Sequence, residues 1–184
     1  MNKDIVIRPV KPEDAESYTN LHNLVWRAAY KDIFPEEVFV DKESKKQKMI
    51  EMFPLFARND NTRMVYVAET GGEIVGFIAG VINANPPHFS EQNFAELEGI
   101  YIHPNFQGVG LGTKFKNIFE KWVSENGASK YVIGVLKDNH KARRVYEKWG
   151  GQLDTYNQPF VKLGKEYEEV YYTCAIKKDN EKEM

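Results

Sequence analysis

The stretch from Ala95 to Thr113, AELEGIYIHPNFQGVGLGT, constrains the fold of this chain more than any other. An extended segment of alternating apolar residues meets a proline and then a glycine-spaced loop, which opens directly into a helical pattern. Gly108, Gly110 and Gly112 lack a Cβ atom, so the backbone can turn sharply and point successive N–H groups at an anion. The first amides of the helix add unpaired donors and the positive end of its dipole. The stretch therefore predicts a site for a phosphate-bearing cofactor.

Two common nucleotide-binding templates do not fit this spacing. The dinucleotide fingerprint requires a third glycine three positions after its second, where this chain has Thr113. The P-loop requires Lys and then Ser or Thr directly after its last glycine, whereas Gly112 is followed by Thr113 and then Lys114. The pattern that fits is Gln107-x-x-Gly110-x-Gly112 after a strand and a proline. It resembles the cofactor motif of the GNAT superfamily of acetyl-CoA-dependent N-acetyltransferases, Gln/Arg-x-x-Gly-x-Gly/Ala at the end of a central strand.

A second motif with the spacing of the same family follows downstream. Asn139-x-x-Ala142-x-x-Val145-Tyr146 and the glycines after it resemble the GNAT pattern Asn-x-x-Ala-x-x-Phe/Leu-Tyr-x-x-x-Gly-Phe, which forms the far wall of the acetyl-CoA site. This chain departs at the last position, where Gly151 replaces the aromatic residue. The segment between the two motifs has room for one helix and one strand, as the GNAT fold requires.

The resemblance implies a fold and a set of cofactor-binding residues. The fold is α+β, an α/β three-layer arrangement in which helices flank a mixed, mostly antiparallel central sheet of about 6–7 strands, splayed at its central strands. Asn139 would hydrogen-bond the pantetheine arm, and Arg143 would lie near the pyrophosphate or the adenosine. The whole expected cofactor set is Ile100, Tyr101, Ile102, Gln107, Gly108, Val109, Gly110, Leu111, Gly112, Thr113, Asn139 and Arg143.

The chemistry of acetyl transfer requires a base and an acid. An alkylamine has a pKa of about 10.4, so a base must remove a proton before the nitrogen attacks the thioester. Glu96 and Glu98 lie two apart on the central strand and so share one face, unless a β-bulge exchanges their orientations. Glu96 lies eleven residues before Gln107, which is where histone-type members of the family place their base. Glu98 lies nearer the loop and is slightly preferred, and both remain candidates. Tyr146 would protonate the departing thiolate.

The acceptor of the acetyl group is less constrained by the sequence. No Ser-His or Cys-His nucleophile pattern stands out, which favours direct transfer without an acyl-enzyme. We expect an N-acetyltransferase that acts on a primary amine of a small molecule of the polyamine, amino sugar or amino acid type. The alternatives are a protein or peptide N-acetyltransferase and a catalytically silent acyl-CoA-binding module. The aromatic segment from Trp26 to Pro35 is similar to that of polyamine-type members, and the family suggests a possible homodimer.

Composition narrows the class of protein. A length of 184 residues suits one domain, which we place at 1–176, followed by a charged C-terminal tail at 177–184. A formal charge of -2 argues against nucleic acid as a partner. The single cysteine, Cys174, excludes an intrachain disulfide, and no Cys/His cluster suggests a metal. The start of the chain lacks a signal-peptide pattern and no apolar run approaches roughly 20 residues, so we expect a cytoplasmic protein without membrane association.

The remaining pattern predicts the other elements. We expect strands at 5–8, 63–69, 73–82, 130–136, 152–156 and 168–176. We expect helices before and through Tyr30, over 44–58, from the glycine loop to Asn126, and after an Asp138-Asn139 cap. Asn83 to Asn93, which contains His88, and a stretch through Asn157, Pro159 and Gly164 are expected loops.

Overall fold

The computed structural model describes residues 4–82 and 94–176. The expected loop at 83–93, with His88, and the expected tail at 177–184 lie outside the described residues. The strands are β1 (Val6–Pro9), β2 (Arg63–Thr70), β3 (Glu73–Ile82), β4 (Ala95–Ile102), β5 (Lys130–Leu136), β6 (Gln152–Lys162) and β7 (Lys165–Ala175). The α-helices are α1 (Ala15–Tyr30), α2 (Glu36–Ser44), α3 (Lys46–Phe56), α4 (Leu111–Glu125) and α5 (His140–Lys148).

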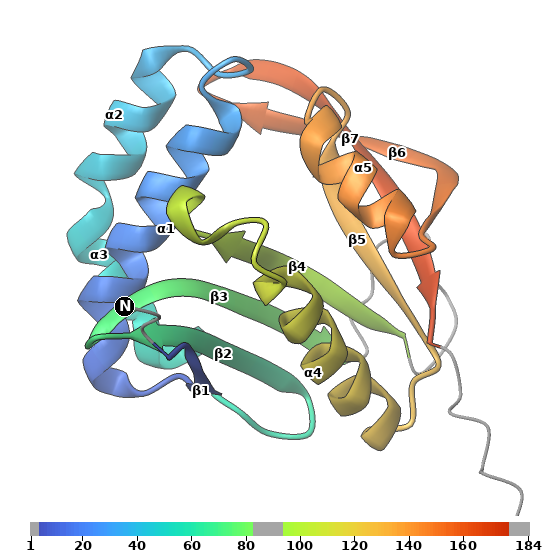
Figure 1. Cartoon of the computed structure of the whole chain (residues 1–184). Helices are drawn as coiled ribbons and strands as arrows, with labels where there is room; N and C mark the ends of the chain where they lie inside the picture. Colours follow the sequence, from blue (N-terminus) through green and yellow to red (C-terminus); the bar gives the residue numbers. More distant parts are fainter. Residues whose placement is uncertain (1–3, 83–93, 177–184) are drawn as a thin grey trace, which may run out of the picture.

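One sheet with the strand order β1-β2-β3-β4-β5-β7-β6 forms the centre of the molecule. Helices α1, α2 and α3 cover one face, and α4 and α5 cover the other (Figure 1). All neighbouring strands are antiparallel except β4 and β5, which are parallel. The predicted three-layer α+β fold with a mostly antiparallel sheet is therefore confirmed.

The parallel pair at the centre of the sheet separates soon after it forms. β4 and β5 pair only at Ala95 with Tyr131 and at Glu96 with Val132. β4 continues to pair with β3 as far as Ile102, while β5 continues to pair with β7 as far as Leu136. The two strands therefore diverge beyond Glu96, as Figure 1 shows, and the predicted splay at the central strands is confirmed.

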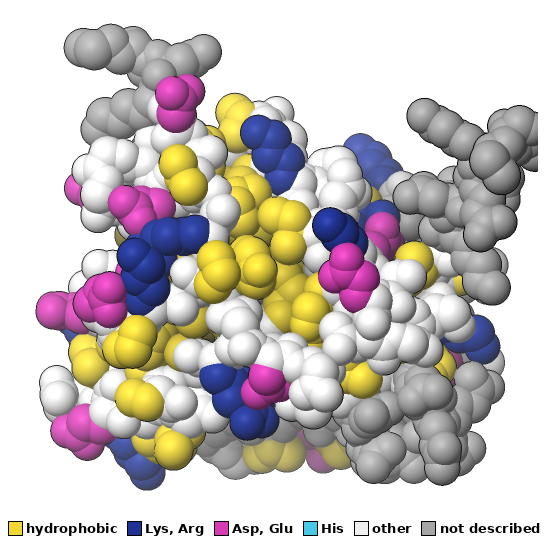
Figure 2. All heavy atoms as spheres, turned by 90° about the horizontal axis from the view of Figure 1, so that it is seen from below, with side chains coloured by type: hydrophobic (Ala, Val, Ile, Leu, Met, Phe, Trp, Pro, Cys, Tyr) yellow, Lys and Arg dark blue, Asp and Glu magenta, His cyan; other side chains and the backbone are white. Residues whose placement is uncertain are grey.

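Three apolar clusters hold the layers together. The first packs α4 and α5 on the sheet, and its tightest contact involves Gly80, where a Cβ atom would lie 2.3 Å from the Phe119 ring. The second packs α1 and α3 on β2 and β3 around Phe53, and the third joins Trp26 of α1 to α2 and to Leu136 of β5. Figure 2 shows the underside of the molecule, where hydrophobic side chains gather near the centre and charged ones surround them.

Two regions differ from the elements expected from sequence. α2 was not expected, and the following helix begins at Lys46 rather than near Ser44. The loop expected through Asn157 and Pro159 was wrong, because both residues belong to β6. β6 is an edge strand, and a proline is tolerated there because an N–H that faces away from the sheet is not needed for pairing.

Candidate active site

The glycine loop after β4 presents an open row of backbone amides. Gly108 and Gly110 have φ of 78° and 83°, a left-handed conformation that favours glycine. A Cβ atom built on either would meet no atom within 4 Å. Gly110 is the N-cap of α4, and among the described residues the amides at 108–113 donate to no backbone acceptor. These donors and the positive end of the α4 dipole form a cradle for an anion.

The residues between and after these glycines fix the start of α4. Leu111 is buried in the first apolar cluster and anchors the helix, whereas the Val109 side chain is exposed. Gly112 differs from the other two glycines, since a Cβ atom there would contact Ile102 Cδ1 at 3.6 Å and Trp149 Cζ2 at 3.9 Å. These are ordinary van der Waals distances, so this position has room for alanine. Thr113 follows within the first turn.

Gln107 ties the loop to both neighbouring elements. Its Nε2 donates to the carbonyl oxygen of Ile102 at 3.0 Å, and its Oε1 accepts from Lys141 Nζ of α5 at 2.7 Å. Sequence reasoning missed Lys141, because 34 positions separate it from Gln107 and no spacing rule connects them. The lysine places a positive charge beside the amide cradle.

Alternate residues of β4 point their backbone N–H and C=O groups toward the gap. His103 donates its amide to Val75 of β3, so in an extended strand the amide of Ile102 points the other way, toward the gap. The Ile102 carbonyl accepts from Gln107 on that side, which agrees with this direction. By the same alternation the amide of Ile100 faces the gap, and that of Tyr101 faces β3. Two of the three candidate amides therefore border the opening.

One of the two candidate carboxylates, Glu98, lies at a β-bulge in β4. The pairing of β4 with β3 shifts there, because Gly80 lies opposite Leu97 and Ala79 lies opposite Gly99. Leu97 packs in the α4 cluster before the bulge and Ile100 packs there after it, so the alternation of faces reverses. Ala95 and Leu97 both pack in the α4 cluster, so Glu96 between them points to the face that α1 covers.

The two carboxylates have different surroundings. Glu98 pairs with Arg63 of β2 at 2.5 Å, and the Nε of Arg63 also donates to the carbonyl of Phe56. Glu96 is half-buried and makes no ion pair within residues 4–82 and 94–176. Burial raises the pKa of Glu96, the charges of Glu98 and Glu169 raise it further, and Arg63 offsets part of this effect. The surroundings of Glu96 therefore increase its affinity for a proton.

Tyr146 lies in α5 on the opposite side of the gap. It is 9% exposed, and its ring contacts those of Trp149 and Tyr172. Burial raises the pKa of Tyr146, and nearby Tyr30 and Cys174 raise it further. Within residues 4–82 and 94–176 its hydroxyl makes no hydrogen bond to another group. A buried, protonated and unpaired hydroxyl is therefore present near the gap.

Asn139 and Arg143 hold the start of α5. Asn139 is the N-cap of this helix, and its Oδ1 accepts from the amide of Ala142 at 3.1 Å. The Arg143 guanidinium donates to the Tyr172 hydroxyl and to the carbonyl of Lys137, both at 3.0 Å. Its Nε and one Nη are thus engaged within the protein, at the junction of β5 and α5.

Both motifs lie within a match to a known protein family. The profile of the acetyltransferase (GNAT) family matches residues 19–151, a span that contains both motifs. This chain belongs to the GNAT family. The match runs from α1 to the glycines after α5 and so includes both sides of the gap between β4 and β5.

Curated relatives carry names of the same class. The chain is 32% identical over 82 residues to an uncharacterized N-acetyltransferase of Archaeoglobus fulgidus, covering 45% of this chain and 55% of the relative. It is 24% identical over 148 residues to an uncharacterized N-acetyltransferase of Methanocaldococcus jannaschii, covering 80% of this chain and 61% of the relative. The matches thus span less than two thirds of these archaeal relatives.

Solved structures share the GNAT fold over nearly the whole chain. The PaiA N-acetyltransferase of Thermoplasma acidophilum, in complex with coenzyme A, superposes with a TM-score of 0.70 at 20% identity, covering 94% of this chain and 99% of that one. The putative acetyltransferase YncA of Salmonella typhimurium, with acetyl-CoA, has a TM-score of 0.63 at 21% identity and 98% coverage of both chains.

The departure from the GNAT pattern at Gly151 has a local explanation. Gly150 has a φ of 89° and donates to the carbonyl of Glu147, while Gly151 donates to that of Tyr146 at 3.0 Å. This pair of bonds is a Schellman C-cap. A Cβ atom at position 151 would lie 2.9 Å from the backbone carbonyl oxygen of Tyr146 and 3.1 Å from Cys174 Sγ. The space near these atoms is already filled, so this chain has no room there for the aromatic residue.

The face covered by α1 carries polar groups from distant strands. Glu169 of β7 accepts from the Tyr171 hydroxyl at 2.8 Å and from Gln158 Nε2 of β6 at 2.7 Å. Gly134 of β5 leaves room for this carboxylate, since a Cβ atom there would lie 3.0 Å from Glu169 Oε1. His22 of α1 packs edge-on against the Tyr101 ring. Burial lowers the pKa of His22 to about 3, so it is neutral. This face forms the second wall of the gap.

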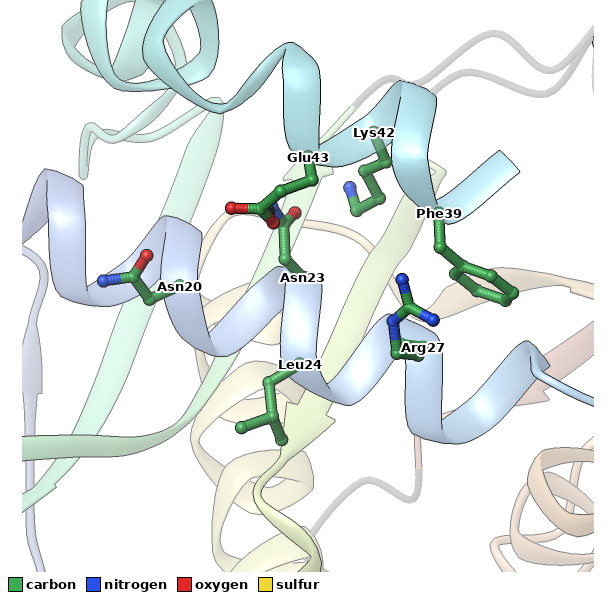
Figure 3. Close-up of a pocket in the computed structure, with 7 residues that line it drawn as sticks. All are labelled: Asn20, Asn23, Leu24, Arg27, Phe39, Lys42 and Glu43. Carbon is green, nitrogen blue, oxygen red and sulfur yellow. Dashed lines mark hydrogen bonds between the residues drawn. The ribbon is translucent and has the colours of Figure 1, made fainter. Parts of the chain in front are cut away.

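A separate hollow lies between α1 and α2. Its volume is about 400 Å³, and Figure 3 shows Asn23 directed toward Glu43 and Arg27 toward Phe39. The α1 residues that line it are on the side of the helix that faces away from the sheet. Neither candidate carboxylate nor Tyr146 lines it. This hollow is therefore separate from the gap between β4 and β5.

Two kinds of feature are absent from the described part of the chain. No helix in residues 4–82 and 94–176 is long and apolar enough to cross a membrane. Over the same residues, no group of three or more His, Cys, Asp or Glu side chains is placed to hold a metal ion.

Proposed function

We propose that this protein transfers the acetyl group of acetyl-CoA to a primary amine of a small molecule, by direct attack without an acyl-enzyme. The observation that carries the proposal is the gap between β4 and β5, with open amides on one side and the half-buried Glu96 on the other. The coenzyme A and acetyl-CoA in the PaiA and YncA structures, which have the same fold, support it.

The residues around the gap suit acetyl-CoA in charge and shape. The amides at 108–113 and Lys141 would bind the pyrophosphate, because they are open donors beside a positive helix end. Asn139 and the amides of Ile100 and Ile102 would border the pantetheine arm and the thioester. Bound acetyl-CoA supplies an acyl carbon with a thiolate leaving group. Arg143 positions the start of α5 through Tyr172 and Lys137, and its remaining Nη would lie near the pyrophosphate or the adenosine.

Glu96 is the proposed base. An alkylammonium has a pKa of about 10.4 and a free glutamate about 4.3, so a raised glutamate pKa narrows the mismatch. The surroundings of Glu96 raise its pKa, whereas Arg63 holds the Glu98 carboxylate in an ion pair. Glu96 takes a proton from the alkylammonium before the nitrogen attacks, and the nitrogen loses its second proton to solvent as the C–N bond forms. The amides of Ile100 and Ile102 stabilise the negative charge that develops on the carbonyl oxygen.

Tyr146 is the proposed acid. Its raised pKa keeps the hydroxyl protonated at neutral pH, so it has a proton to donate when the C–S bond breaks. A free thiol has a pKa of about 8.5, so this transfer is uphill and must accompany the cleavage. Tyr146 then recovers a proton from solvent, and Glu96 returns its proton to solvent.

The test combines binding with turnover. Calorimetry measures binding of acetyl-CoA, and thiol release is followed over a panel of amino acids, amino sugars, polyamines and a peptide amino group. We expect binding and acceptor-dependent release with a small amine. Binding without release for any acceptor would contradict the proposal and favour a silent acyl-CoA-binding module. Release with the peptide alone would favour a protein N-acetyltransferase.

A further inference from the structure

Two lysines from distant elements converge on the ring of Trp26, on the α1 face of the sheet. Lys42 Nζ of α2 lies 5.2 Å from the ring centroid, and Lys162 Nζ of β6 lies 6.0 Å from it. We call Lys42 and Lys162 the lysine pair. Neither makes an ion pair with any carboxylate in the described part of the chain. Two cations therefore share one aromatic platform without a described counter-ion.

This arrangement has an electrostatic cost. A single ammonium over an indole is favourable, but a second one adds repulsion between like charges. Burial and, to a smaller extent, the charge of Lys162 lower the pKa of Lys42 to about 8, and Glu43 opposes this only in part. Both lysine side chains are half-buried rather than free in solvent. A bound anion between the two ammonium groups would remove the repulsion.

A series of aromatic side chains connects the lysine pair with the proposed reaction centre. Trp26 packs against Tyr30 with ring centroids 5.0 Å apart and against Leu136 of β5. Tyr30 in turn lies near enough to Tyr146 to raise its pKa, and it interacts with Asn139. Two aromatic side chains thus separate the lysine pair from the proposed acid.

We propose that the acceptor amine carries an oxyanion, a carboxylate or phosphonate, and that Lys42 and Lys162 bind it above Trp26 while the amine faces Glu96. This inference rests on the proposed function and narrows its substrate class to amino acid-like amines. Glu98 is paired with Arg63, and Glu169 accepts hydrogen bonds from Tyr171 and Gln158. These two carboxylates are therefore less available to bind the second ammonium group of a diamine acceptor. A diamine would also bring a positive charge to the lysine pair.

The test compares acceptors that differ only at the end remote from the amine. Short linear amino carboxylates are assayed beside their amides and the diamines of the same length, with thiol release as the readout. We expect the KM for the amino carboxylate to be about tenfold lower than the KM for its amide, because the carboxylate makes a charge-assisted contact with the lysines. The diamine should have the highest KM of the three. Equal use of the three probes, or preference for the diamine, would overturn the inference and leave the proposed acetyl transfer standing.

Substitutions of the two lysines test whether they bind the carboxylate of the acceptor. Lys42→Met and Lys162→Met should each raise the KM for the amino carboxylate about tenfold, with kcat and the KM for the amide unchanged. Lys165→Met is the matched control, because its Nζ lies over Tyr167 in the same hairpin and not over Trp26. An equal effect of Lys165→Met, or an equal loss with the amide, would contradict a role in anion binding.

A readout without turnover separates this inference from the proposed function. The indole N–H signal of Trp26, assigned by its loss in Trp26→Phe, is followed by NMR as the amino carboxylate is added. We expect a saturable shift in the wild type that is absent in Lys42→Met. A shift without thiol release from any acceptor would overturn acetyl transfer but support the anion site. Thiol release from the carboxylate without a Trp26 shift would overturn the anion site.

Discussion

The two walls of the gap between β4 and β5 are built in different ways. On the cofactor wall, which comprises 100–113 and the start of α5, the proposed ligands are mostly backbone amides of one continuous stretch. The acceptor wall comprises α1, α2, the β6–β7 hairpin and Glu96. Its proposed ligands are side chains that lie far apart in the sequence; Lys42 and Lys162, for example, are 120 positions apart. A site made of backbone donors changes little when side chains are substituted, whereas a site made of side chains changes with each substitution.

The largest expected effect is on the acid that lies between the walls. Tyr146→Phe should lower kcat about 10²-fold or more, because the leaving thiolate loses its proton donor, while the Kd for acetyl-CoA changes less than twofold. Steady-state kinetics and calorimetry measure the two quantities. Tyr131→Phe is the control, since that hydroxyl donates to Glu120 away from the gap. Full kcat in Tyr146→Phe over the pH range would remove the assigned role.

The next effect distinguishes the two carboxylates. Glu96→Gln should lower kcat/KM about 10- to 10²-fold and abolish the limb that rises with pH as Glu96 loses its proton. Because the pKa of Glu96 is raised, this limb in the wild type lies above the pH at which an ordinary glutamate titrates. Glu98→Gln should cost less than about fivefold, since its carboxylate is already paired with Arg63. The reverse ranking would assign the base to Glu98.

A smaller effect should separate two glycines of the cofactor wall. Gly110→Ala should raise the KM for acetyl-CoA about tenfold, because a φ of 83° strains alanine and the methyl group faces the proposed phosphate site. Gly112→Ala should change it less than about twofold, since the added methyl group makes ordinary contacts with Ile102 and Trp149. Equal effects of both substitutions would show that backbone conformation is not what the loop contributes.

The smallest effect is on stability. The pKa of Glu96 is raised in the folded protein, so the folded state binds more protons than the unfolded state between the two pKa values, and stability falls as pH rises through them. Glu96→Gln should therefore be more stable than the wild type at neutral pH, by less than about 1 kcal/mol after solvent screening. The difference should vanish below the pKa of an unfolded glutamate. Urea unfolding at both pH values measures it, and a variant less stable at neutral pH would contradict the raised pKa.

The contrast between the walls also explains what the sequence could predict. The cofactor wall follows from glycines at fixed spacing, because a backbone site depends on local conformation, and the strand, loop and helix around Gly110 were confirmed. The bulge at Glu98 was only an open alternative, since it depends on the pairing with β3. Arg63 lies 35 positions from Glu98, and no local pattern indicates their pairing. The length of β6 was missed because Pro159 is tolerated at an edge.

The central claim is that backbone amides of the cofactor wall bind acetyl-CoA independently of the acceptor wall. NMR of the backbone amides during titration with coenzyme A tests it most directly. We predict saturable shifts and slower hydrogen exchange at Ile100, Ile102 and residues 108–113, unchanged in Lys42→Met. Shifts confined to α2 and the β6–β7 hairpin, with none at 108–113, would contradict the account.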